Sequence, residues 1–81
     1  MHELGIVERI LEVAVERARA AGSTRVTAVH VEVGESSGVD PESLELHWPI
    51  VSAPSIARGA TLDVAVVPLS SHLRMVAVDA D

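Results

Sequence analysis

Apolar and charged residues alternate with the period of an α-helix at the start of the chain. Apolar positions recur every three or four residues between positions 3 and 21, and glutamates occupy the opposite side. This spacing predicts an amphipathic helix over residues 3–21. Gly22 follows as the residue type that accepts the left-handed conformation at helix ends. The buried stripe is expected to contain Leu4, Val7, Leu11, Ala14, Ala18 and Ala21.

Three later segments alternate with the period of two that is typical of β-strands. In residues 25–33 the valines at 29, 31 and 33 share one side, and Ala28, His30 and Glu32 share the other. Residues 62–67 and 73–78 form two further alternating runs, separated by five residues from Pro68 to His72. In the last run, strict alternation places Met75 with Ala77 and Val76 with Val78. These two runs predict a β-hairpin with a five-residue loop.

A second helix is predicted to begin at Pro41. Asp40 suits the cap position, Pro41 suits the first turn, and Glu42 lies near the positive end of the helix dipole. Pro49 lacks the amide that an interior helical position donates, so we expect a kink or an early end near Trp48. The apolar side of this helix contains Leu44, Trp48 and Val51.

The order α-β-α-β-β predicts an α+β fold of one domain over residues 1–81. Because each helix has one apolar stripe, we expect a two-layer sandwich with two helices packed on one face of a three-stranded sheet. The other face of the sheet is predicted to be polar and to face water. It would carry Ala28, His30, Glu32, Arg74 and either Thr61 with Asp63 or their neighbours, depending on the register.

Composition narrows the functional classes. The 81 residues are 48% hydrophobic, which is enough for one core. A chain of this size buries a smaller fraction of its surface than a larger domain does, so its stability is marginal, and a homodimer is one expected assembly. Twelve acids against six bases give a net charge of −6, and Trp48 is the single aromatic residue, so nucleic-acid binding is not expected. Charged residues interrupt the first apolar stretch, which argues against a membrane span or signal peptide and favours the cytoplasm.

Side chains that carry chemistry are few. There is no phosphate-binding glycine loop and no cysteine, and a two-layer domain this small offers little room for a substrate pocket, so we do not expect an enzyme. Three of the four histidines, His30, His47 and His72, lack metal-ligand spacing and are interpreted as ordinary surface or half-buried residues.

His2 differs because of its position beside the amino terminus. The terminal amine, the amide nitrogen of His2, its imidazole and the amide of Glu3 can all reach one cation. Four nitrogens in a plane suit Ni(II) or Cu(II) and disfavour tetrahedral Zn(II). These residues alone leave a second explanation open, namely that His2 occurs by chance or as a cloning remnant.

Short motifs follow one another along most of the chain. They are Met1-His2-Glu3-Leu4, Val31-Glu32-Val33-Gly34, Ser37-Gly38-Val39, Pro41-Glu42-Ser43-Leu44, Gly59-Ala60-Thr61-Leu62 and Val67-Pro68. In this order they resemble the HypA family, the nickel metallochaperones of hydrogenase and urease maturation. The resemblance extends to about Pro68 and implies a cytoplasmic protein that receives Ni(II) and passes it on.

The resemblance also implies a ligand set and partners. In the family the ligands are the terminal amine of Met1, the imidazole of His2 and the backbone amides of His2 and Glu3. A GTPase of the HypB type takes part in loading the nickel enzyme precursor. The metal site is therefore expected at Met1, His2 and Glu3.

Two departures from the family pattern accompany the resemblance. Family members continue after the Val-Pro pair into a zinc-binding module with two Cys-x-x-Cys pairs, and then return to the sheet. Here that module is missing between about residues 68 and 73, and no structural zinc is expected because the chain has no cysteine. Pro49 is the second departure, and it puts in question a partner surface on the helix that contains it.

The leading hypothesis is a nickel-binding maturation factor that delivers Ni(II) to a hydrogenase-type precursor. The alternative is a metal-free interaction module, a degenerate relative that docks a GTPase or an enzyme precursor. Glu8, Glu12 and Glu16 form an acidic row on the first helix. This row fits either a solvated helix face or a partner surface.

Overall fold

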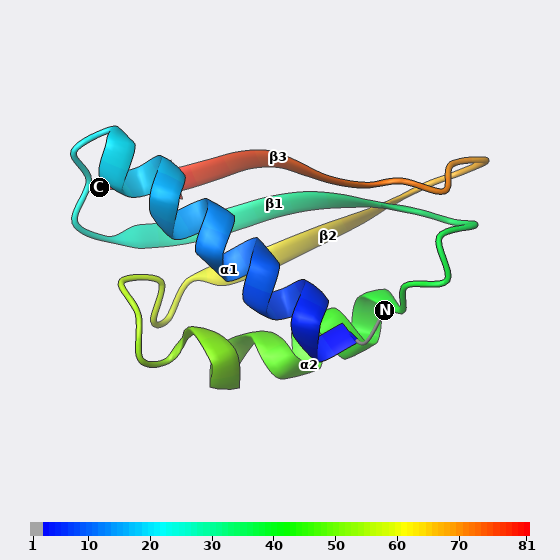
Figure 1. Ribbon diagram of the computed structural model, residues 1–81, viewed down its shortest axis with the longest axis horizontal. Coiled ribbons are helices and arrows are strands. Elements are labelled where there is room, and N and C mark those ends of the chain that lie inside the picture. Colours follow the sequence, from blue (N-terminus) through cyan, green and yellow to red (C-terminus); the bar gives the residue numbers. More distant parts are fainter. Residues whose placement is uncertain (1–2) are drawn as a thin grey trace.

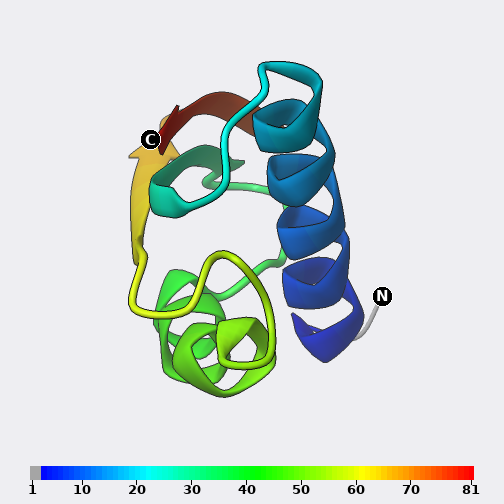
Figure 2. The same cartoon turned by 90° about the vertical axis from the view of Figure 1, so that its left-hand side faces the viewer.

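The computed structural model describes residues 3–81 and shows two helices on one side of a three-stranded sheet (Figures 1 and 2). This arrangement confirms the predicted α+β sandwich and its element order. The bounds of the first helix and the first strand also agree with the sequence prediction to within one residue at each end. The elements are α1 (Glu3–Ala20), β1 (Val26–Gly34), α2 (Pro41–Ser52), β2 (Thr61–Val67) and β3 (Leu73–Ala80).

The predicted hairpin is wrong, because the last two strands are not neighbours. The sheet order is β2-β1-β3, with β1 parallel to β2 and antiparallel to β3. The long connection through α2 returns the chain parallel to β1, as parallel pairing requires. The central strand β1 is therefore paired along both edges. Its inward valines are almost completely buried. Alternation located the strands correctly but did not indicate which strands are paired.

The loop of residues 68–72 crosses the end of β1 to reach the other edge of the sheet. Two backbone bonds hold the loop against the end of β1, from Gly34 N to His72 O at 2.6 Å and from Ser36 N to Ser70 O at 2.8 Å. A Cβ at position 34 would lie 2.3 Å from the carbonyl oxygen of Ser70. Glycine is therefore required at position 34 for this close crossing.

A β-bulge in β3 corrects a second prediction. Met75 pairs with Val31 and Ala77 pairs with His30, which leaves Val76 as the extra residue. Met75 therefore points toward the helices, whereas Ala77 lies on the open face. Strict alternation placed Met75 and Ala77 on the same face, because a bulge shifts the pattern by one residue without a clear sequence signal.

The end of α1 matches its prediction in detail. Gly22 has a φ of +77°, and Ser23 N donates to Ala18 O at 2.9 Å, as in the bond pattern that commonly closes a helix. The stripe of α1 that faces the sheet is buried between residues 6 and 18, and it packs on the inward side of β1. The predicted stripe is wrong at Leu4 and Ala21, which are exposed, and it missed Ile6 and Ile10. Apolar residues occur on more than one side of this helix, so the spacing alone did not fix which side is buried. The buried residues of α1 are Ile6, Val7, Ile10, Ala14 and Ala18.

The predicted start of α2 is confirmed, and of the two alternatives predicted at Pro49, a kink or an early end, the early end is wrong. The Asp40 side chain accepts a hydrogen bond from Glu42 N at 3.1 Å. The helix continues through Pro49 to Ser52. Pro49 and Glu45 are both exposed, so the Glu45 carbonyl that loses its helical donor lies on the solvent side. Burial of the opposite side of the helix stabilises it beyond the proline.

Candidate functional site

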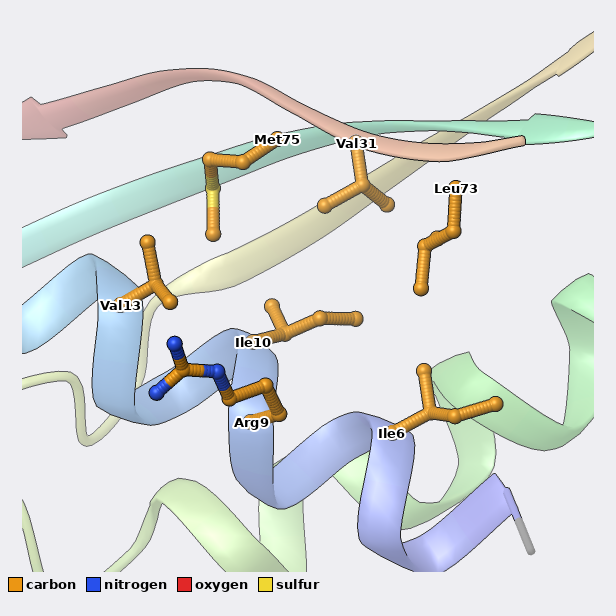
Figure 3. Close-up of a pocket in the computed structure, with 7 residues that line it drawn as sticks. All are labelled: Ile6, Arg9, Ile10, Val13, Val31, Leu73 and Met75. Carbon is orange, nitrogen blue, oxygen red and sulfur yellow. The ribbon is translucent and has the colours of Figure 1, made fainter. Parts of the chain in front are cut away.

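The first half of α1 is anchored on the sheet by apolar side chains. Figure 3 shows side chains of the helix and of β1 and β3 facing one another across a small slot. The slot has a volume of about 210 Å³ and is apolar apart from Arg9. This packing fixes the direction in which the helix begins. The apolar lining consists of Ile6, Ile10, Val13, Val31, Leu73 and Met75.

Two of the three predicted metal ligands, Met1 and His2, lie outside the residues that the structure describes. The third, Glu3, is the first residue of α1. The first four amides of a helix have no intrahelical acceptor, so the Glu3 amide is not committed to the helical bond pattern. Of the predicted ligands, the structure therefore describes the Glu3 amide, which lies in the first turn of α1 and makes no helical hydrogen bond.

His30 lies on the open face of the sheet between two carboxylates. Its Nδ1 lies 3.0 Å from Asp63 Oδ2, and its Nε2 lies 2.9 Å from Asp79 Oδ2. The three residues come from β1, β2 and β3, so their side chains bridge the whole width of the sheet. The hydrogen bond to Asp79 raises the pKa of His30 above its ordinary 6.5, and the hydrogen bond to Asp63 is the second cause of this shift. Only the protonated ring can donate to both carboxylates at once.

This bridge predicts that stability falls as pH rises. A raised pKa means that the folded state holds the proton more tightly than the unfolded state, so the contribution is complete below about pH 6.5. It is lost as pH rises through the folded-state pKa of His30. Urea midpoints at about pH 6 and about pH 8.5 should differ more for the unmodified protein than for His30→Gln. Equal differences in the two proteins would contradict the bridge, and His72→Gln serves as the control.

The open face agrees with its prediction and adds one residue that was missed. The parallel register places Thr61 and Asp63 beside Ala28 and His30, which settles the alternative left open by the sequence. Arg74 Nη2 lies 3.1 Å from Glu32 Oε1 in a second cross-strand pair. Asp79 was not predicted as a partner of His30, because only the antiparallel register of β3 brings it there.

The remaining histidines do not assemble a metal site. His47 Nδ1 lies 2.8 Å from the Ser43 carbonyl oxygen within α2, and His72 is exposed in the loop before β3. Both ring nitrogens of His30 already face carboxylates from opposite sides. Among residues 3–81, no three His, Cys, Asp or Glu side chains are grouped so as to hold a metal ion.

The described helices also include none that is long and apolar enough to cross a membrane.

A family model of hydrogenase/urease nickel incorporation metallochaperones, HypA, matches residues 1–73. The chain belongs to the HypA family. The match includes the amino-terminal segment with Met1, His2 and Glu3, and it ends at the first residue of β3. The resemblance found from the short motifs is thereby confirmed at the level of the family.

Curated HypA relatives share about a third or more of the aligned residues. The hydrogenase maturation factor HypA of Acidithiobacillus ferrooxidans is 37% identical over 68 residues, which cover 84% of this chain and 60% of the relative. That of Roseiflexus sp. is 42% identical over 72 residues, covering 89% of this chain and 58% of the relative. The chain thus spans about 60% of the length of these relatives.

Two solved HypA structures have the same fold. The solution structure of the Ni metallochaperone HypA from Helicobacter pylori superposes with a TM-score of 0.86 at 17% identity, covering 99% of this chain and 97% of that one. A second structure, a solution structure of HypA protein, gives a TM-score of 0.71 at 22% identity, covering 91% of this chain and 68% of that one. At these identities the likeness establishes the fold.

Proposed function

We propose that this protein is a nickel-binding maturation factor that delivers Ni(II) to a hydrogenase-type enzyme precursor. The observation that carries the proposal is the HypA family match over residues 1–73, which contains the amino-terminal segment. Curated relatives aligned over most of the chain are named hydrogenase maturation factors, which supports this recipient class. The family resemblance also supports a cytoplasmic place of action.

The proposed ligands are the Met1 amine, the His2 imidazole and the amide nitrogens of His2 and Glu3. Two amides that lose their protons carry two negative charges, which balance the charge of Ni(II) and leave a neutral centre. A neutral centre avoids placing net positive charge against the positive end of the α1 dipole. The start of α1 at Glu3 supports the proposal, because an amide in this position need not break a helical bond to bind a metal.

Delivery of nickel requires partner proteins that exchange the metal with this chain. We infer that a GTPase of the HypB type and the nickel enzyme precursor are the proteins that exchange metal with it. The role is that of a carrier and requires no catalytic group. The 81 residues contain no cysteine, so a thiolate zinc site cannot form within them. The family match ends where β3 begins, which supports the proposal that the zinc module is missing between about residues 68 and 73.

Metal selectivity tests the proposed ligand set. Deprotonated amides favour square-planar ions, so we expect Cu(II) to bind more tightly than Ni(II), with Zn(II) far weaker. Nickel affinity should rise with pH between about 6 and about 8.5, because the imidazole and the terminal amine must first lose their protons. Competition titrations at several pH values measure both effects. Zn(II) binding as tight as Ni(II) binding would contradict four-nitrogen planar ligation.

A further inference from the structure

An open groove runs between α1 and α2, on the side of α1 away from the slot in Figure 3. The two helices pack against each other (Figure 2). The groove has a volume of about 500 Å³. Its apolar lining comes from Leu11 and Val15 of α1 and Val51 of α2. All three side chains are only partly buried, so apolar surface remains accessible along the groove.

The α1 side of the groove is acidic. Glu8, Glu12 and Glu16 all line it, at a spacing that places them one above the other over about 12 Å of helix. Glu12 pairs with Arg9 at 2.5 Å, whereas Glu8 and Glu16 form no ion pair with any residue between 3 and 81. Arg19 is the single cation among the lining residues. Two uncompensated carboxylates therefore border an apolar strip.

Two exposed apolar side chains of α2 lie outside the groove lining. Ile50, which precedes Val51 of the groove wall, is 76% exposed, and Leu46 is 74% exposed one turn earlier. Residues four apart on a helix are neighbours, so these two side chains form a continuous patch. Because neither side chain lines the groove, this patch supplies an apolar control surface for the docking test.

We propose that the groove between α1 and α2 docks a basic amphipathic helical segment of another protein. A helix that presents an apolar stripe flanked by Lys or Arg matches both the apolar floor and the acidic rim. The inference concerns a docking surface and does not depend on nickel binding at the amino terminus.

Charge argues against other occupants. The helices available from a second copy are α1, which carries the same acidic row, and α2, which carries Glu42 and Glu45 and no Lys or Arg. A second copy in the groove would place carboxylates against carboxylates. Nucleic acids and anionic lipid surfaces have the same sign as this chain, whose net charge is −6. The observations therefore favour a basic protein segment.

The test uses a synthetic helical peptide of about 15 residues as the probe. Its sequence has a leucine stripe flanked by lysines, and a matched peptide replaces every lysine with glutamate. Fluorescence anisotropy of the labelled peptides should show binding of the lysine peptide alone. That binding should weaken by about tenfold or more between about 50 mM and about 300 mM NaCl. Backbone amide shift changes should map to α1 and α2.

Two double variants distinguish the effect of the glutamates that line the groove from the effect of net charge. Glu8→Gln with Glu16→Gln should weaken lysine-peptide binding by about tenfold. Glu35→Gln with Glu45→Gln makes the same change in net charge away from the groove and should leave binding within about twofold. Leu46→Ser with Ile50→Ser alters exposed side chains outside the groove lining, so the fold is retained and lysine-peptide binding should stay within about twofold.

Several results would overturn the inference. These are absence of lysine-peptide binding at low salt, equal weakening in the two glutamine variants, and shift changes confined to the sheet. A dimer in sedimentation that the peptide disrupts would assign the groove to a second copy instead. Nickel titration of the Glu8→Gln, Glu16→Gln variant should be unchanged, so failure of the docking surface and failure of the metal site are distinguishable.

Discussion

His2→Ala is expected to abolish specific Ni(II) binding, lowering affinity by about a hundredfold or more. Changes to residues that merely orient a metal ligand cost up to about a hundredfold, so removing a ligand itself should cost at least as much. The imidazole is the one side-chain nitrogen in the proposed set, and the backbone groups alone cannot restore it. Isothermal titration of the purified protein, without an amino-terminal tag, measures this loss.

The matched controls are the other three histidines of the chain. His47→Ala and His72→Ala should leave nickel affinity unchanged, because neither side chain lies in a group of metal-binding residues within the described part of the chain. His30→Ala should also leave nickel affinity unchanged, although it removes the bridge to Asp63 and Asp79. Loss of nickel binding in any of these variants would place the site elsewhere.

Among the substitutions proposed for this protein, Trp48→Ala is expected to lower the free energy of unfolding most, by about 3–5 kcal/mol. Trp48 is 2% exposed, and its Nε1 donates to the Ala60 carbonyl at 2.9 Å, which ties α2 to the start of β2. The substitution leaves a cavity and also removes the donor to that carbonyl. Urea unfolding followed by circular dichroism measures the change without relying on tryptophan fluorescence.

Two further substitutions test the explanation of this loss. Trp48→Phe retains much of the burial and removes the hydrogen bond, so it should cost less than the alanine variant. Leu46→Ala changes a side chain that is 74% exposed on the same helix, and it should stay within about 0.5 kcal/mol of the unmodified protein. A loss at Leu46 comparable with that at Trp48 would contradict the assignment of the buried face of α2.

Periodicity located the elements because burial imposes a period on each of them. Helix α1 and strand β1 each have one buried face, so the bounds of both were predicted within about one residue. The same reasoning could not determine strand order. Residues 62–67 and 73–78 are close in sequence and alternate similarly, yet each pairs with an opposite edge of β1. Pairing depends on how α2 returns the chain, which local pattern does not encode.

Prediction of the candidate site rested on different information. His2 is informative because of its distance from the amino terminus, and the family match includes that segment. By contrast, the contacts of His30 with Asp63 and Asp79 join residues 33 and 49 positions apart. No spacing rule predicts such pairs. They arise from strand register and from the bulge near Met75, both of which are tertiary features.

Nickel titration of the protein with a free Met1 amine, beside the same protein acetylated at Met1, tests the proposed site most directly. The free form should bind one Ni(II) and develop the visible absorbance of a square-planar nitrogen site. The acetylated form should lose both, with an unchanged circular dichroism spectrum, because the core of the fold is independent of the amine. Equal nickel binding by the two forms would contradict the amino-terminal mechanism and assign the metal to the remaining histidines.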